Sequence, residues 1–249
     1  MKKILFTIIC LQMSLLTFAI DKMSEATQFY SVGEYDKALE IYNSLIDEDL
    51  SSVALFYNAG NTNFKLGNIG KSILCYERAL VLDPNNEDVK YNLELAQSKV
   101  TDNIEVIKPF IFTRIYNSII ETKSSNSWAV LSLVCLVVAL ACFFVYFFVR
   151  EYNWLRKTTF FSSLVVFLCF ILFTIFAVSQ KNKVENRNNA IVMDATVSVK
   201  GSPDSSAIDL FVIHEGTKVE IVETLGNWIQ IKLQDGNKGW LISKSVEVI

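Results

Sequence analysis

The sequence predicts a multidomain protein in three parts: α-helical repeats, a two-helix transmembrane hairpin and a small all-β barrel. Three observations lead to this prediction. A period of 34 residues runs through residues 21–107, two uncharged apolar stretches cover residues 128–149 and 160–178, and apolar and polar residues alternate within residues 191–249. Each pattern matches one kind of element, because side chains recur on one face every few residues in a helix and every second residue in a strand.

Charge is unevenly distributed along the 249 residues, whose formal net charge is −3. Residues 21–107 hold 15 acidic and 7 basic side chains, and residues 190–249 hold 8 and 5. Because nucleic acids bind basic surfaces, these acidic segments argue against a nucleic-acid partner. The chain has one histidine, and its five cysteines lack the spacing of metal ligands. We therefore expect no metal site, no cofactor, no catalytic residues and no enzymatic activity.

Residues 1–20 have the order of a secretory signal peptide: two lysines, an apolar core and small residues near Ala19. We expect cleavage after Ala19, with an uncleaved anchor as the alternative. Large residues precede Cys10, which argues against a lipoprotein cleavage site. Either reading sends the following segment out of the cytoplasm.

The period in residues 21–107 is that of the tetratricopeptide repeat, a unit of two antiparallel helices. Gly33 and Gly67 lie 34 residues apart and suit the turn inside each pair, and Pro84 ends the second helix of the better copy. Residues 85–88 are expected to cap one more helix, which closes the stack. Two repeats and a cap are few for a stable stack, so marginal stability without the membrane or a partner is expected.

Polar and aromatic side chains recur on the first helix of each unit and form a candidate partner-binding groove. Asn58 and Asn92 share a register 34 residues apart. One interpretation is an amide ladder that binds an extended peptide, and the other is hydrogen bonding between adjacent helices. The candidate groove residues are Tyr57, Asn58, Asn61, Phe64 and Asn92. Helical spacing places Tyr35, Leu39, Tyr42, Ile73, Tyr76 and Leu80 in the core.

Residues 108–127 precede the hairpin and carry apolar side chains at helical spacing, at positions 112, 115, 116 and 119. This pattern predicts an amphipathic juxtamembrane helix over the run 110–120, in the plane of the lipid headgroups, with a polar spacer at residues 123–127; a plain linker is the alternative. Trp128 is expected to anchor the first span at the interface.

Residues 128–149 and 160–178 each approach or exceed the roughly 20 residues that a transmembrane helix needs. The link at 150–159 carries three basic side chains, which predicts a cytoplasmic loop. Signal and hairpin together predict an inner-membrane protein with two spans, whose soluble domains both face the periplasm. Neither span holds an ionisable side chain, so an ion path is not expected.

A linker is expected at residues 179–190, and short strands follow. Alternation is clearest at residues 195–199, 217–223 and 228–233, with a late strand at 239–242. The stretches Val197-Ser198-Val199-Lys200, His214-Glu215-Gly216-Thr217 and Asp235-Gly236-x-x-Gly239-Trp240 resemble a bacterial SH3 domain, which implies an SH3-like barrel over residues 191–249. Trp228 and Trp240 are candidates for an aromatic ligand-binding wall. The alternative is that they fill the core, which we favour for Trp240, and His214 is expected to be a turn residue.

The complete order of segments resembles the E component of the Bat (Bacteroides aerotolerance) proteins. Phe56-Tyr57-Asn58-x-Gly60-Asn61, Tyr91-Asn92-Leu93-Glu94-Leu95-Ala96 and Ile191-Val192-Met193 carry the resemblance, together with residues 210–219. Ala59, Asn63 and Ser72 depart from the family pattern. The family implies a non-enzymatic inner-membrane component linked to tolerance of oxidative stress. Its expected partners are von Willebrand A-type Bat membrane proteins and a MoxR-type ATPase.

The leading hypothesis is therefore a membrane-anchored periplasmic adaptor, with two outward modules about one hairpin apart that bind one partner complex. The alternative is a cell-wall protein that binds peptidoglycan through its SH3-like domain and localises a wall enzyme.

Overall fold

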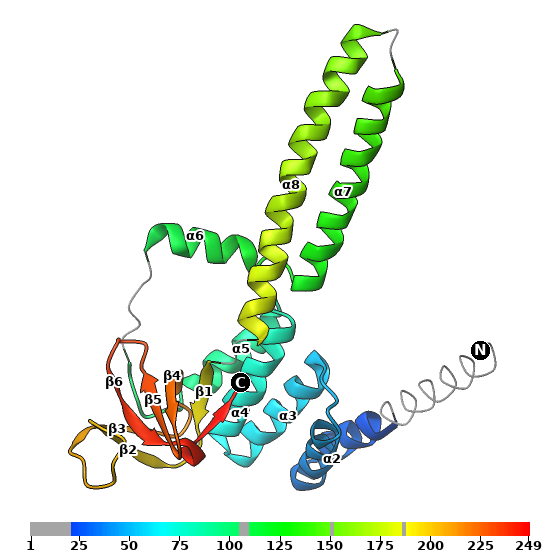
Figure 1. The fold of residues 1–249 in the computed structure, drawn as a ribbon. Coiled ribbons are helices and arrows are strands. Elements are labelled where there is room, and N and C mark those ends of the chain that lie inside the picture. The colour runs from blue at the N-terminus through cyan, green and yellow to red at the C-terminus, as the bar shows by residue number, and fades with distance from the viewer. Residues whose placement is uncertain (1–20, 105–109, 150–151, 186–187) are drawn as a thin grey trace, which may run out of the picture. The chain divides into compact units, whose positions relative to one another are not determined.

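The structure, a computed structural model, describes residues 21–104, 110–149, 152–185 and 188–249. The expected signal peptide at residues 1–20 lies outside the described residues. The chain divides into two compact units. One unit combines the N-terminal helices with the C-terminal sheet, and the other holds the long hairpin (Figure 1).

The N-terminal helices have the antiparallel arrangement that the repeat predicts. A helix over residues 21–31 precedes α2 (Tyr35–Asp47), α3 (Val53–Leu66), α4 (Ile69–Leu82) and α5 (Glu87–Gln97). Gly33 and Gly67 have φ of +84° and +82°, a left-handed conformation that glycine adopts without steric cost. Asn86 supplies the expected cap of α5, because its side-chain oxygen accepts from Val89 N–H at 3.1 Å.

The core of the repeats contains the side chains that helical spacing selects. Tyr42, Ile73 and Tyr76 are buried, and the remaining three predicted core residues are half-buried. Leu45 and Leu55 are buried together with Tyr42 in one hydrophobic cluster of the repeats.

Within residues 188–249, all of them described, seven antiparallel strands form one sheet in the order β3-β2-β6-β5-β4-β1-β7. The strands are β1 (Asn189–Val192), β2 (Thr196–Lys200), β3 (Asp209–His214), β4 (Lys218–Leu225), β5 (Trp228–Lys232), β6 (Lys238–Ile242) and β7 (Val246–Val248). Four of them match the predicted strands. The strands β1, β3 and β7 were not predicted, and β1 begins inside the expected linker.

The sheet and the helical repeats share one hydrophobic core. Ile191 of β1 and the terminal Ile249 are buried in the same cluster as Ile73 of α4 and Leu93 of α5, and β1 lies beside α4 (Figure 1). In a longer stack, a further repeat would pack on the apolar side chains of the last helices. Here the sheet packs on them instead. The expectation of two separate modules one hairpin apart is therefore wrong: the repeats and the sheet form a single body.

Polar contacts reinforce this junction. Lys218 Nζ of β4 lies 2.7 Å from Glu77 Oε2 of α4. Arg78 of α4 donates to the Val248 carbonyl at 2.7 Å. At the start of α4, Gly70 N–H donates to Glu215 Oε1 at 2.8 Å. These charged groups lie at the edge of the shared core, where each has a partner instead of being buried alone.

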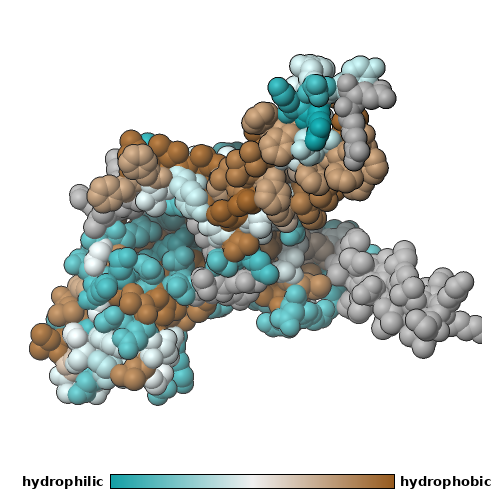
Figure 2. All heavy atoms as spheres, turned by 45° about the horizontal axis from the view of Figure 1, so that its top comes forward, coloured by the Kyte–Doolittle hydropathy of each residue, from teal (hydrophilic) through white to brown (hydrophobic). Residues whose placement is uncertain are grey.

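The second unit contains α6 (Ile111–Ile120), α7 (Ser125–Phe148) and α8 (Asn153–Glu185). By length and composition, α7 and α8 can both cross a membrane, and the 24 residues of α7 extend about 36 Å. Hydrophobic side chains cover the visible face of the hairpin (Figure 2).

Several predicted boundaries of this unit are wrong. The helix α8 includes much of the expected loop at 150–159 and most of the expected linker at 179–190, because residues 153–185 contain no proline or glycine to end it. The helical run predicted at residues 110–120 is present as α6 (Ile111–Ile120). Trp128, expected at the lipid interface, is 5% exposed, packs against Phe176, and donates from Nε1 to the Ile120 carbonyl at 2.9 Å.

Candidate partner-binding site

Four of the repeat side chains form one hydrogen-bond network on α3, α4 and α5. Asn92 Nδ2 donates to Asn61 Oδ1 at 2.8 Å and to Tyr57 Oη at 3.1 Å. Tyr76 donates its hydroxyl to the same Asn61 oxygen at 2.7 Å. Tyr57, Asn61 and Asn92 are all partly exposed, so the network lies at the surface of the first helices. Burial raises the pKa of Tyr76, which keeps its hydroxyl protonated as a donor.

This network fixes the orientation of both amides. Because Asn61 Oδ1 and Asn92 Nδ2 face each other, Asn61 Nδ2 and Asn92 Oδ1 remain as donor and acceptor. No described residue hydrogen-bonds to either atom, and neither is fully buried. A fixed donor beside a fixed acceptor suits an extended peptide, whose backbone presents both a C=O and an N–H.

The other two groove candidates lie elsewhere. The side-chain hydrogen bonds of Asn92 go to Tyr57 and Asn61 and not to Asn58, so Asn58 and Asn92 do not bond to each other. Phe64 is half-buried against the core of the second repeat. The interhelical alternative thus describes the bonding of Asn92, and the candidate residue Asn61 is the centre of the network, because its oxygen joins α3, α4 and α5.

The two tryptophans of the sheet share one face. Trp228 pairs with Ile242, and Trp240 pairs with Gln230 across the same two strands. Because alternate residues point to opposite faces, both tryptophans lie away from the core residues Ile229 and Leu241. Trp240 is 8% exposed although it is outside the core cluster. Trp228 is half-exposed in a cross-strand row with Leu225 and Ile242, which are 56% and 48% exposed.

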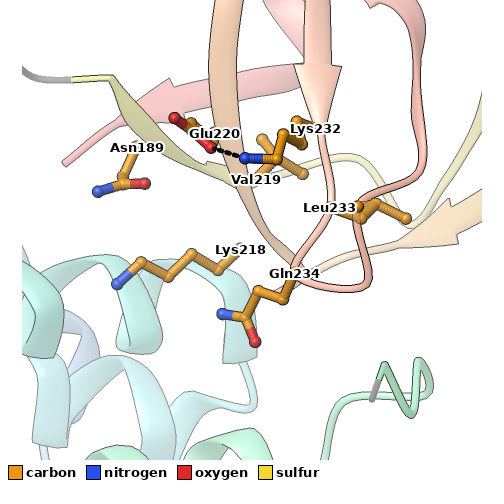
Figure 3. Close-up of a pocket in the computed structure, with 8 residues that line it drawn as sticks. Asn189, Lys218, Val219, Glu220, Lys232, Leu233 and Gln234 are labelled. Atoms are coloured by element: carbon orange, nitrogen blue, oxygen red, sulfur yellow. Dashed lines mark hydrogen bonds and ion pairs between the residues drawn. The ribbon is translucent and has the colours of Figure 1, made fainter. Parts of the chain in front are cut away.

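A cavity of about 310 Å³ lies on the sheet beside the helical repeats (Figure 3). Its lining includes Asn189, Lys218 and Gln234, and Lys232 pairs with Glu220 at 2.9 Å. Lys218 extends from the sheet toward the helices (Figure 3), where it meets Glu77. Both lysines are therefore paired with carboxylates, so this cavity does not have the character of an anion site.

Asp102, which follows α5, holds the β3–β4 turn. Its Oδ2 accepts from His214 N–H at 2.7 Å and from the Thr217 hydroxyl at 2.6 Å, and its Oδ1 lies 2.6 Å from His214 Nδ1. Burial alone would raise the pKa of Asp102, but hydrogen bonds from Thr217 and His214 outweigh burial and hold it below its usual value. The expectation for His214 was therefore incomplete: it ends β3 and also joins the sheet to the repeats.

The described residues contain no cluster of three or more metal-ligating side chains. Cys75 is buried in α4, and burial raises the pKa of its thiol to about 12, which suppresses the reactive thiolate.

Comparison with known proteins identifies two regions. Residues 53–86 match the tetratricopeptide repeat, and residues 195–247 match the bacterial SH3 domain. No curated protein matches the chain. The first match covers the helix pair α3–α4, and the second covers the sheet from just before β2 into β7. Both domain types are consistent with the binding of proteins or of the cell wall.

Proposed function

We propose that this protein is a membrane-anchored adaptor that binds an extended segment of a partner protein along the first helices of its repeats. The amide pair of Asn61 and Asn92 is the observation that carries this proposal. Tyr91, whose side chain is 69% exposed, lies next to Asn92 on α5 and adds an aromatic contact surface. The sheet is attached through α4 and leaves this network partly exposed.

The compact body also supports a hairpin topology. Its two parts, residues 21–104 and 188–249, stand before and after the apolar helices in the sequence. Because a folded body cannot lie on both sides of a bilayer, the chain must cross an even number of times between them. The export signal and the basic link in the sequence support a periplasmic position for this adaptor, on an inner membrane.

From the resemblance of the whole domain order, we infer a role in a Bat-type complex linked to aerotolerance and oxidative stress. The partners would be von Willebrand A-type membrane proteins and a MoxR-type ATPase. In this role the protein positions other components and catalyses no reaction itself.

The experiment is site-specific photo-crosslinking in intact cells. A photoreactive residue replaces Tyr91, and the matched control replaces Glu40, which is exposed on the second helix α2. We expect defined protein adducts from position 91 only. The double variant Asn61→Ala/Asn92→Ala should reduce these adducts about tenfold, since two hydrogen bonds are lost. Equal adducts from both positions, or adducts unaffected by the double variant, would count against the groove.

Peptidoglycan binding is the second candidate function, favoured by the exposed row Leu225–Trp228–Ile242 on an SH3-like sheet. An exposed aromatic surface of this kind suits the sugar rings or stem peptides of the wall. Sedimentation of the full chain with purified peptidoglycan tests it. Wall binding predicts pelleting that Trp228→Ala reduces, whereas an adaptor of proteins alone predicts no pelleting.

A further inference from the structure

Two cavities adjoin at the end of the hairpin where α7 is followed by α8. The first, of about 310 Å³, is lined by Tyr146 of α7 and by residues of the first turns of α8, among them Asn153, Arg156 and Lys157. The second, of about 280 Å³, lies between the two helices and is almost wholly apolar. Phe160 lines both cavities, so the two are adjacent.

The first cavity has the chemistry of a phosphate site. The Arg156 guanidinium lies 5.1 Å from the centroid of the Tyr146 ring, and this cation–π contact holds the charge against α7. Lys157 and the Asn153 amide supply further donors. No ion pair of the described residues involves Arg156 or Lys157. A guanidinium, an ammonium and an amide together recognise phosphate oxygens through charge-assisted hydrogen bonds.

The second cavity has the chemistry of an acyl-chain groove. Leu136, Leu140 and Phe143 line it from α7, and Phe160, Leu164 and Phe167 line it from α8. Seven residues of helix separate the ends of each row, which gives a groove about 10 Å long. Its one hydroxyl is already used, because Ser163 Oγ donates to the Ala139 carbonyl at 3.0 Å. Leu140 and Leu164 are about half exposed, so the groove opens sideways toward lipid.

We propose that this end of the hairpin binds one anionic phospholipid, with its phosphate against Arg156 and Lys157 and an acyl chain between α7 and α8. Two adjacent cavities of opposite polarity fit an amphiphile, and neither a free anion nor an alkane would fill both. Basic pockets between membrane helices bind anionic headgroups by this chemistry. The site rests on the membrane insertion in the proposed function, but it requires neither a partner protein nor the periplasmic assignment.

The test is native mass spectrometry of the full chain, purified in mild detergent and mixed with equal amounts of phosphatidylglycerol and phosphatidylethanolamine. We expect one retained phosphatidylglycerol per chain in preference to phosphatidylethanolamine. Arg156→Gln/Lys157→Gln should lower its affinity about thirtyfold, from the loss of two cations. The control Arg114→Gln/Lys123→Gln removes the same charge elsewhere in this unit and should leave the affinity unchanged.

A second pair of variants tests the groove. Leu140→Trp fills it without changing charge and should abolish lipid retention, whereas Leu133→Trp, at an exposed position that does not line the cavity, should not. Equal retention of the two lipids by the wild-type chain would overturn the proposal. So would equal losses in test and control variants. Complete displacement of the lipid by inorganic phosphate would also overturn it, because it would show a free-anion site instead of a phospholipid site.

Discussion

The substitution Gly216→Ala should weaken the packing between the repeats and the sheet more than Gly226→Ala does. Both glycines have positive φ, +87° and +60°, so each substitution costs about 1–2 kcal/mol of backbone strain. At Gly226 a Cβ would meet no atom within 4 Å. At Gly216 it would lie 2.8 Å from Val100 Cγ2 and 3.0 Å from Ile73 Cδ1, both from the helical repeats.

The additional cost at Gly216 is that of overpacking. Forcing a methyl group into a packed contact costs about 1–3 kcal/mol, and the lower end applies because the two contacted methyl groups lie at the ends of side chains. One to two kcal/mol corresponds to an increase of about five- to thirtyfold in the opening of the junction. The affected backbone should include α4, because Ile73 belongs to it.

Hydrogen exchange of the full chain, read by mass spectrometry, measures this opening. We expect amides of α4 and β1 to exchange faster in Gly216→Ala than in Gly226→Ala, in which exchange rises only near the β4–β5 turn. Identical exchange of α4 in the two variants would refute the packing of the sheet on the repeats.

Three further predictions follow from the same junction. The pKa of Asp102 is lowered in the folded protein, so the stability that its carboxylate contributes is fully present above the unfolded pKa of about 3.9 and is lost as pH falls below that value. The melting temperature of Asp102→Asn should therefore fall less steeply below about pH 4 than that of the wild type. Parallel curves for the two proteins would exclude this role. The Cys75 thiol should react with maleimide only after denaturation, and stoichiometric labelling of the native chain would show that α4 is not covered. Ile249→Ala should destabilise the compact body by about 2 kcal/mol, because it removes a buried side chain from the shared core, whereas Lys244→Ala should leave the denaturation midpoint unchanged.

Local patterns in the sequence predicted the helices, the turns and the apolar spans. Gly33 and Gly67 indicate turns, because glycine adopts the left-handed backbone conformation that these turns require. Alternation of apolar and polar residues indicates β4 and β5, because each of these strands has one buried face. β1 and β7 are too short to show a period. The continuation of α8 to Glu185 was missed because polar residues after an apolar span were read as a linker, although nothing among them ends a helix.

The junction between repeats and sheet was not predictable from one sequence. Glu77 and Lys218 are 141 residues apart, and each is an ordinary surface charge in its own segment. Asp102 stands in a short segment without periodicity, so nothing local indicates its contact with His214. The hydrogen bonds that join Tyr57, Asn61 and Asn92 were not predictable, because helical spacing assigns a face and does not show which amide meets which.

Zero-length carbodiimide crosslinking of the full chain tests the single compact body most directly. Glu77 Oε2 and Lys218 Nζ are 2.7 Å apart across the junction, and Glu220 and Lys232 are 2.9 Å apart within the sheet. The structure predicts an amide link between Glu77 and Lys218 in the wild-type chain, alongside the link within the sheet. If the Glu220–Lys232 link formed while no link joined the repeats to the sheet, the single body would be contradicted.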